Sequence, residues 1–291
     1  MCLVALAFRM LPDGATLVAA NRDEFHARPT QPLHAWPDWP EVIAGRDGQA
    51  GGTWMGMTPA GRFAFVTNYR DPGHQRADAR SRGDLVSRFL QGNEPAEPYM
   101  AAIAARGHEY NGFNLIVGTP HEAWYYSNMG APPCALEAGI YLLSNHLLDS
   151  PWPKALRVRQ GFEALVSRMR LGGTQSHGAA HDASTLHSLH AHPSVMHDAP
   201  DVVRAQAGEI TRMMRDTTPA PDAALPSTGL TLARERLLSS PFIVSADYGT
   251  RSTAVMQVGG HGTPWISETR YGPDGLPQGT TLLTATAQTR S

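Results

Sequence analysis

The sequence predicts an α+β protein in which helices cover antiparallel sheets. Strand patterns come first, helical patterns fill the middle and strand patterns close the chain, an order unlike the alternation of a parallel βαβ array. The 291 residues contain 42% hydrophobic side chains, enough for a substantial core. We expect a single domain over residues 1–291, because the sequence contains no internal repeat and no shift in composition that would mark a linker.

The first third of the chain is expected to form hairpins. Residues 2–10 and 15–23 are strand-like and flank LPDG, whose Pro, Asp and Gly are typical of turns. The segment GGTWMGMTPAGRFAFVTNY repeats the pattern of strand, Pro/Gly turn and strand. SRGDLVSRFLQG then predicts a helix with Ser81 as its N-cap, Asp84 three residues later and Gly92 after its last turn.

The middle and end of the chain combine one long helix with further strands. FNLIVGTPHEAWYYSN predicts two strands around a turn, GIYLLSN predicts another strand, and SPWPKALRVRQGFEALVSRMRL predicts a helix. A His-rich insertion is expected around residues 174–200 and a Pro-rich loop around residues 216–230. SPFIVSADYGTRSTAVMQV predicts two strands around a Tyr-Gly turn, and PWISETRY predicts a last strand.

Composition points to a soluble cytoplasmic protein, whereas a small-molecule partner is expected from the motifs around Cys2. The formal net charge is -2 and no basic block occurs, so we expect no nucleic-acid partner. The sequence starts without a secretory signal, and its apolar runs are too short for an integral membrane segment. Two cysteines give no disulfide framework, and Cys134 follows two prolines as an incidental loop thiol.

The first hairpin is expected to bring Cys2 beside the NRDE sequence. With a three- or four-residue loop around Pro12–Gly14, the numbers of paired residues sum to roughly twenty-five or twenty-six. Cys2 then lies opposite Asp23 or Glu24. A buried thiol and a solvated polar turn are the ordinary alternatives, but neither explains why the pairing brings the two together.

A cysteine in this position suits an N-terminal nucleophile. Removal of Met1, which methionine aminopeptidase accepts before a small residue, would expose an α-amine with a pKa of ~7.7–8. That amine could take the thiol proton, so that Cys2 supplies both nucleophile and base. We expect Asp23 to hold the amine, and Arg22 to support the thiolate or bind a carboxylate of the substrate.

Several motifs together resemble the NRDE family, also called the transport and Golgi organisation protein 2 family. They span residue 2 to about residue 258 and are MCLVALAF, AANRDEFHARPT, GGTWMGM, TNYRDP, SRGDLV, FNLIVG, LSNHLLDSPWPK and YGTRSTAV. The resemblance implies an N-terminal-nucleophile-hydrolase-like fold, a four-layer αββα sandwich of two antiparallel sheets. It also implies links to lipid metabolism, membrane trafficking and haem trafficking.

Within that superfamily the resemblance extends to cysteine amidases such as choloylglycine hydrolases, penicillin V acylases and acid ceramidase. The positions that match them are Cys2 as nucleophile, Asn21 and Asp23 on the hairpin, Asn68 and Asn145 for the oxyanion, and Arg251 as the late arginine. Ala20 stands where those amidases usually carry an arginine. Arg22 lies on the other strand face from Asn21, unless a bulge re-aims it or the register puts Glu24 in place of the usual Asp.

The hypothesis that follows is an N-terminal cysteine amidohydrolase for a linear amide such as an acylated amine, with no cofactor and no metal. The catalytic residues would be Cys2, Asp23, Asn145, Asn68 and Arg251, and the binding residues Asn21, Arg22, Glu24, Trp54, Tyr69 and Arg70. Trp54 would cover the pocket mouth or belong to the core, and Arg251 could instead form a surface ion pair.

Two other functions stay open. One is a non-catalytic carrier of haem or acyl-CoA, a hydrophobic anion, and the other is an adaptor in secretory organisation. The sequence therefore leaves open whether the pocket turns over a substrate. Six histidines between residues 177 and 197 could bind a metal, but a soluble insertion is the favoured interpretation because recognised ligand spacings are missing.

Overall fold

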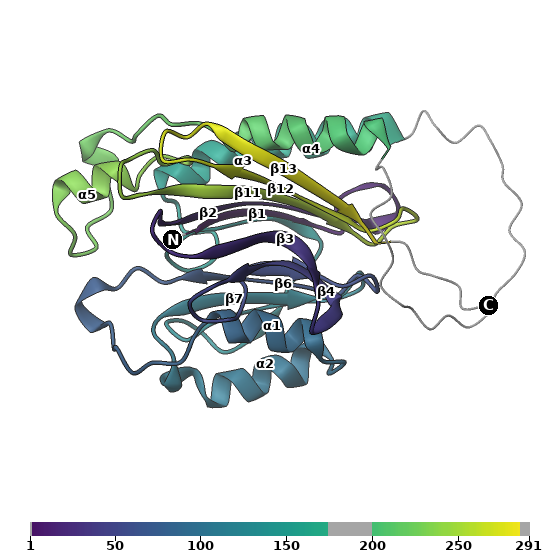
Figure 1. The fold of residues 1–291 in the computed structure, drawn as a ribbon, viewed down its shortest axis with the longest axis horizontal. Coiled ribbons are helices and arrows are strands. Elements are labelled where there is room, and N and C mark those ends of the chain that lie inside the picture. The colour runs from purple at the N-terminus through teal and green to yellow at the C-terminus, as the bar shows by residue number, and fades with distance from the viewer. Residues whose placement is uncertain (1, 174–199, 286–291) are drawn as a thin grey trace, which may run out of the picture.

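The computed structural model describes residues 2–173 and 200–285, and it contains two antiparallel sheets between two layers of helices (Figure 1). The first sheet runs in the order β10 (Gly139–Leu143), β1 (Cys2–Phe8), β2 (Thr16–Phe25), β11 (Tyr248–Val258), β12 (Trp265–Tyr271) and β13 (Pro277–Thr284). The second runs in the order β3 (Thr30–Trp36), β4 (Trp39–Asp47), β5 (Met55–Met57), β6 (Phe63–Asn68), β7 (Phe113–Gly118), β8 (Ala123–Ser127) and β9 (Cys134–Ala135). The predicted α+β sandwich of two antiparallel sheets is confirmed.

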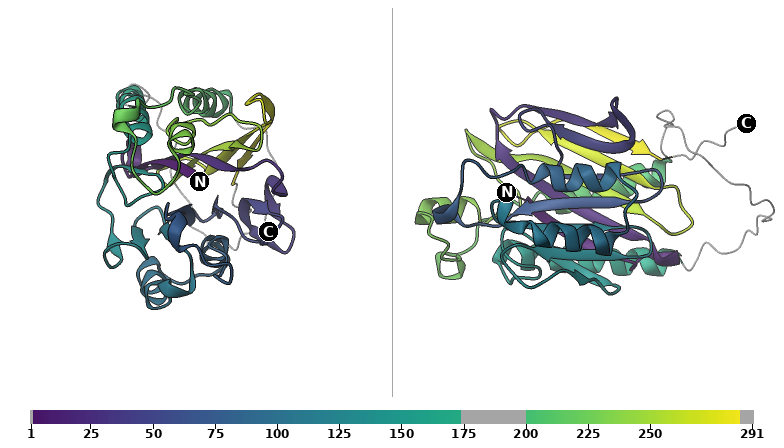
Figure 2. Two further views of the ribbon diagram at one scale, coloured as in Figure 1. Left: turned by 90° about the vertical axis from the view of Figure 1, so that its left-hand side faces the viewer. Right: turned by 90° about the horizontal axis from the view of Figure 1, so that it is seen from below.

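Helices cover the outer face of each sheet. On the first sheet lie α3 (Pro153–Gly173) and α4 (Asp201–Met213), and on the second lie α1 (Gly83–Gln91) and α2 (Ala96–Ala105) (Figures 1 and 2). The short helix α5 (Leu232–Leu237) lies at the end of the molecule where β1 begins. Among the described helices, none has both the length and the apolar character that a bilayer crossing requires.

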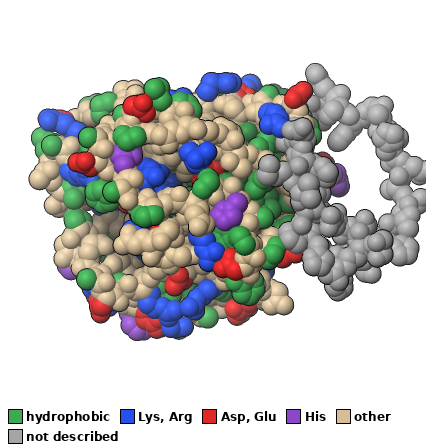
Figure 3. Space-filling view, in the orientation of Figure 1, with side chains coloured by type: hydrophobic (Ala, Val, Ile, Leu, Met, Phe, Trp, Pro, Cys, Tyr) green, Lys and Arg blue, Asp and Glu red, His purple; other side chains and the backbone are tan. Residues whose placement is uncertain are grey.

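The opening apolar run is explained by burial of β1 on both faces. Val4, Leu6 and Phe8 pack in the core between the two sheets, whereas Leu3 and Ala5 pack under α3 and α4. Successive side chains of a strand point to opposite faces, so a strand buried on both sides reads as a continuous hydrophobic run. On the face shown in Figure 3, acidic and basic side chains of the described residues are interspersed.

The first hairpin forms, but its predicted register is wrong. Its connection spans residues 9–15 and includes the 3-10 turn Pro12–Gly14, so it is longer than three or four residues. The backbone N–H of Arg9 donates to Thr16 Oγ1 at 3.1 Å, which closes the longer loop. Cys2 consequently pairs with Arg22, instead of with Asp23 or Glu24.

Two further boundaries differ from the prediction. Helix α1 begins at Gly83 with Arg82 in the N-cap position, so Ser81 lies outside it, while Gly92 ends it as expected. At the end of the chain, Tyr248 and Gly249 open a single strand, β11, and residues 240–247 before them form turns and coil. These turns are held by hydrogen bonds between Ile243 and Thr250.

Of the two segments that were predicted to be irregular, the structure describes only one in full. The predicted histidine-rich insertion, 174–200, lies outside the described residues except for its last position. The proline-rich stretch, 216–230, contains the 3-10 turn Asp222–Ala224 and is otherwise coil and bends. Strands β7 and β8 and helix α3 form where the sequence predicted them.

Candidate functional site

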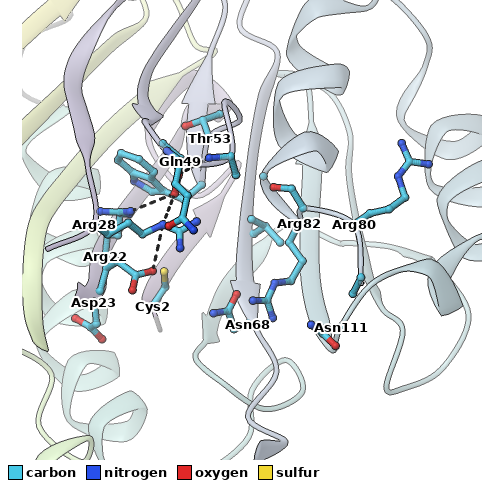
Figure 4. A pocket seen from close by; sticks show the side chains of 18 of the residues that line it. Cys2, Arg22, Asp23, Arg28, Gln49, Thr53, Asn68, Arg80, Arg82 and Asn111 are labelled. Atoms are coloured by element: carbon cyan, nitrogen blue, oxygen red, sulfur yellow. Dashed lines mark hydrogen bonds and ion pairs between the residues drawn. The ribbon is translucent and has the colours of Figure 1, made fainter. Parts of the chain in front are cut away.

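A pocket of about 420 Å³ opens at the end of the molecule where β1 begins (Figure 4). Its walls come from the start of β1, the end of β2, the connection from β4 to β5, the end of β6 and the segment before α1. Its charged lining residues are Arg22, Arg28, Arg76, Arg80 and Arg82 against Asp23, Glu24 and Asp47. The pocket is therefore polar and has an excess of cationic side chains.

Cys2 lines this pocket from the first residue of β1. Its side chain is half-buried, and its carbonyl oxygen accepts a hydrogen bond from Ser144 Oγ at 3.4 Å. Burial raises the pKa of the Cys2 thiol above its ordinary value, so the thiol is protonated at neutral pH. A nucleophilic role would therefore require a base to remove the proton.

Arg22 lies directly across the hairpin from Cys2, on the same face of the sheet. Its guanidinium stacks on Trp54 with 4.1 Å to the ring centroid, and its Nη2 lies 3.7 Å from Asp47 Oδ2. Nη1 donates to Thr30 Oγ1 at 3.2 Å. These three contacts fix Arg22 and Trp54 as one wall of the pocket.

Asp23 is buried beneath the same hairpin, and its environment depends on a bulge in β11. The pairing of β2 with β11 shifts between Thr250 and Ser252, so that Arg251 is the extra residue. Thr250 therefore lies opposite Asp23 and donates its hydroxyl to Asp23 Oδ1 at 2.7 Å. Burial raises the pKa of Asp23. The bulge thus lies in the partner strand and does not re-aim Arg22.

Asn21 and Arg251 take up positions away from the pocket lining. Asn21 Nδ2 donates to the carbonyl oxygens of Met214 and Pro241 at 2.8 and 2.9 Å, so its amide secures the segments that follow α4 and α5. Arg251 Nη1 donates to the carbonyl oxygens of Phe25 and Arg28 at 2.9 and 3.2 Å and so stabilises the turn at residues 25–28. Both contacts are with backbone oxygens, as expected for residues that hold the fold around the site.

Asn145 lies behind the pocket and is joined to Asn68 and to a buried lysine. Its Nδ2 donates to the Asn68 carbonyl oxygen at 3.0 Å, and its Oδ1 accepts from Lys154 Nζ at 3.4 Å. The backbone N–H of Arg70 donates to the Asn145 carbonyl oxygen at 2.7 Å. The Asn145 amide is therefore held on both sides, while Asn68 itself lines the pocket.

Lys154 is the residue that sequence reasoning missed here. It is only 2% exposed, and burial lowers its pKa to about 8, while the nearby Asp23 carboxylate opposes that shift. The sequence does contain a sign of its burial, because the spacing of four residues places Lys154 on the same helical face as Val158 and Phe162, which are buried core residues. A lysine on an apolar helix face is unusual because its charge is costly to bury.

Lys154 gives a testable pH dependence. Its pKa is lower in the folded state than in the unfolded state, so the unfolded chain binds more protons between about pH 8 and pH 10.5. The free energy of unfolding should therefore rise by up to about 3 kcal/mol across this range, relative to Lys154→Met. Urea unfolding of both proteins at pH 7.5 and pH 10 measures the difference. The same change with pH in the two proteins would contradict the lowered pKa of Lys154.

The remaining predicted binding residues divide between the pocket and its surroundings. Glu24 lines the pocket, and its Oε1 accepts from the N–H of Phe25 at 2.8 Å. Arg70 forms a buried ion pair with Glu235 at 2.7 Å. The Tyr69 ring packs on His146, 5.0 Å between centroids. The pocket lining thus includes six of the predicted residues, namely Cys2, Arg22, Asp23, Glu24, Trp54 and Asn68.

Comparison with known proteins identifies the family. The family described as Transport and Golgi organisation 2 matches residues 1–273. This chain belongs to the Transport and Golgi organisation 2 family. The bovine Transport and Golgi organization protein 2 homolog is 32% identical over 284 residues, which cover 92% of each chain. The Mus musculus homolog is 38% identical over 181 residues, 58% of this chain and 65% of the mouse protein, so that alignment spans just under two thirds of the relative.

A solved structure was also found. The Caenorhabditis elegans N-acylethanolamine-hydrolyzing acid amidase ortholog aligns with a TM-score of 0.40 and 10% identity, covering 56% of this chain and 79% of that one. In this member of the Transport and Golgi organisation 2 family, five of the motifs that carried the resemblance contribute to the pocket lining. They are MCLVALAF, AANRDEFHARPT, GGTWMGM, TNYRDP and SRGDLV.

Proposed function

We propose that this chain is an N-terminal cysteine amidohydrolase that cleaves a linear amide of a small acylated amine. The observation that supports the proposal most strongly is the surroundings of Cys2. The residue lines a polar pocket, and the buried side chains of Asp23, Asn145 and Lys154 lie behind it. A concave pocket with convergent polar groups and perturbed pKa values is the arrangement expected of a catalytic site.

The base in this proposal is the α-amine of Cys2 after removal of Met1. Because burial raises the pKa of the thiol, little thiolate forms without a base. A free α-amine with a pKa of ~7.7–8 is uncharged in roughly 10–15% of molecules at pH 7, far more than a lysine, and that form can take the proton. The Asp23 carboxylate would then hold the resulting ammonium group.

The bond changes are those of acyl transfer through a thioester. The sulfur of Cys2 attacks the carbonyl carbon, the C–N bond breaks, and the ammonium group returns its proton to the leaving amine. Water then attacks the thioester carbon, which releases the carboxylic acid and regenerates the thiol. The amide of Asn68, which lines the same pocket as Cys2 (Figure 4), would donate to the oxyanion. Such a donor contributes about 3–4 kcal/mol in hydrolases.

The excess of arginines in the pocket also suits a carrier of an anionic ligand such as haem or acyl-CoA. In that alternative the arginines bind the anion and no bond is broken. The two functions differ in what they require of Cys2. A carrier needs only the shape and charge of the pocket, whereas the hydrolase needs a free N-terminus and a reactive thiol.

The direct experiment measures N-terminal processing and thiol reactivity together. Intact mass of the protein purified from cells should show loss of Met1. A cysteine-directed acylating probe, followed by peptide mapping, should label Cys2 in preference to the exposed Cys134. Quantitative retention of Met1, or labelling confined to Cys134, would defeat the hydrolase proposal.

A further inference from the structure

Arg82 has a fixed position in the pocket wall opposite Cys2. It directly precedes α1, where the backbone of Gly83 packs against Gly52 so closely that a Cβ on Gly52 would lie 2.6 Å from the Gly83 carbonyl carbon. The N–H of Thr53 also donates to the Gly83 carbonyl oxygen at 3.4 Å. Arg82 is thus fixed on one side by the GGTW segment.

The segment before Arg82 is fixed as well. The Asn111 side chain accepts from the N–H of Arg76 at 2.8 Å and donates to its carbonyl oxygen at 2.9 Å. The N–H of Arg80 donates to the Glu109 carbonyl oxygen at 3.0 Å. The wall that carries Arg82 is therefore organised before any ligand binds, which lowers the entropic cost of binding.

The other arginines of the pocket already have acidic partners. Arg22 and Arg28 share Asp47, at 3.7 and 2.7 Å. Arg80 pairs with Glu109 at 2.9 Å. Arg76 lies 3.8 Å from Asp78. The positive charge of these four side chains is therefore partly or fully neutralised within the protein.

Arg82 differs from all of them. Its Nη1 donates to the Gly112 carbonyl oxygen at 3.2 Å, and within residues 2–173 and 200–285 its guanidinium has no carboxylate oxygen within 4.0 Å. Burial lowers the pKa of Arg82, and the Cys2 sulfur and the more distant Glu24 carboxylate oppose that shift. A half-buried guanidinium without an ion-pair partner in direct contact, in the same pocket as the thiol, is well placed to bind an anionic group of the ligand.

We propose that Arg82 binds a carboxylate or phosphate of the substrate, so that the enzyme acts on acylated amines that carry an anionic group. This inference rests on the proposed function and narrows its substrate class. Guanidinium groups bind both anions in a bidentate geometry, so the two share one recognition chemistry. A cavity of about 420 Å³ has room for a short acyl amide with such a group.

The test uses three hexanoyl amides that differ only in the polar end of the amine. They are N-hexanoylethanolamine, which is neutral, N-hexanoylglycine, which carries a carboxylate, and N-hexanoyl-O-phosphoethanolamine, which carries a phosphate. Calorimetric titration into Cys2→Ala measures binding without turnover. We expect the charged compounds to bind about 10- to 100-fold more tightly than the neutral one. The tighter of the two charged compounds identifies the natural anion.

Variants of Arg82 in the Cys2→Ala protein complete the experiment. Arg82→Gln should remove the preference, and Arg82→Lys should keep part of it while guarding against a folding defect. Arg106→Gln is the matched control, because Arg106 pairs with Glu109 on the surface and lies outside the pocket lining. It should leave the preference unchanged.

The outcomes separate this inference from the proposed function. Equal binding of the neutral and charged amides, or an unchanged preference in Arg82→Gln, overturns the role of Arg82 even if the native protein hydrolyses them. A preference that depends on Arg82 in a protein without hydrolysis keeps the anion site and rejects the hydrolase.

Discussion

Replacing Cys2 by alanine is expected to abolish amide hydrolysis while leaving the fold and ligand binding intact. The thiol is the only group in the proposed mechanism that forms a covalent bond to the acyl carbon, so its loss should lower kcat by at least about 10³-fold. Alanine still permits removal of Met1 and keeps the α-amine. The measurement is steady-state hydrolysis of the hexanoyl amides, with unfolding curves to confirm the fold.

Two matched variants make this result specific. Cys134→Ala removes the other cysteine, which is exposed on β9, and should leave hydrolysis unchanged. Cys2→Ser keeps a nucleophilic atom at the same position and should retain a small residual rate. Undiminished hydrolysis in Cys2→Ala would reject the N-terminal nucleophile, and the carrier would become the better account.

Breaking the buried ion pair behind the site is expected to produce the largest loss of stability. The side chains of Arg70 and Glu235 are 3% and 5% exposed, and Glu235 Oε1 also accepts from the N–H of Thr228 at 3.1 Å. Arg70 stacks on Trp152 at 4.6 Å. Arg70→Met leaves the Glu235 charge buried without its partner, which should lower the free energy of unfolding by about 3–5 kcal/mol.

The contrast with a surface pair tests the role of burial. Arg106→Gln breaks an exposed pair with Glu109 and should have little effect, because solvent screens such pairs. The double variant Arg70→Met/Glu235→Leu removes both buried charges and should recover part of the loss. Urea unfolding at pH 7 gives all four values. If Arg70→Met lowers the free energy of unfolding no more than Arg106→Gln does, the Glu235 carboxylate is solvated without its partner and the prediction is wrong.

The prediction from sequence worked best where local pattern decides structure. Helix α3 and strands β7 and β8 have strong periodicity or turn signals, and each formed as predicted. The predicted hairpin register was wrong because the connection, residues 9–15, extends three residues before the turn Pro12–Gly14 and only one after it, which moves the centre of the hairpin toward the N-terminus. Strands β3, β4 and β13 were among the elements missed. The pairing of β3 with β4 contains two register shifts, and β4 pairs with β5 at only two positions, so β3 and β4 show little regular alternation.

The residues of the candidate site that lie on the first hairpin were predictable from the sequence. Those contributed by segments far apart in the sequence were not. Cys2, Arg22 and Asp23 come together through one local turn, so sequence reasoning reached them. Lys154 reaches Asn145 only because α3 packs on the first sheet, and Arg82 faces the pocket only because the second sheet lies opposite. The residues next to Lys154 and Arg82 in the sequence do not show how α3 packs on the first sheet or how the two sheets face each other.

The central location of β2 limits where the molecule can yield to a ligand. Strand neighbours hold Asn21 and Arg22 on both sides, and β11 holds Asp23 and Glu24 on one side, so the backbone of this part of β2 is restrained. The backbone of the opposite wall is also held, at Arg76 by Asn111 and at Arg80 by Glu109, so adaptation to a larger ligand is expected from side chains rather than from the backbone. Substitutions of side chains within residues 69–82 should therefore change which ligand sizes the pocket accepts, while the wall formed by β1 and β2 keeps its shape.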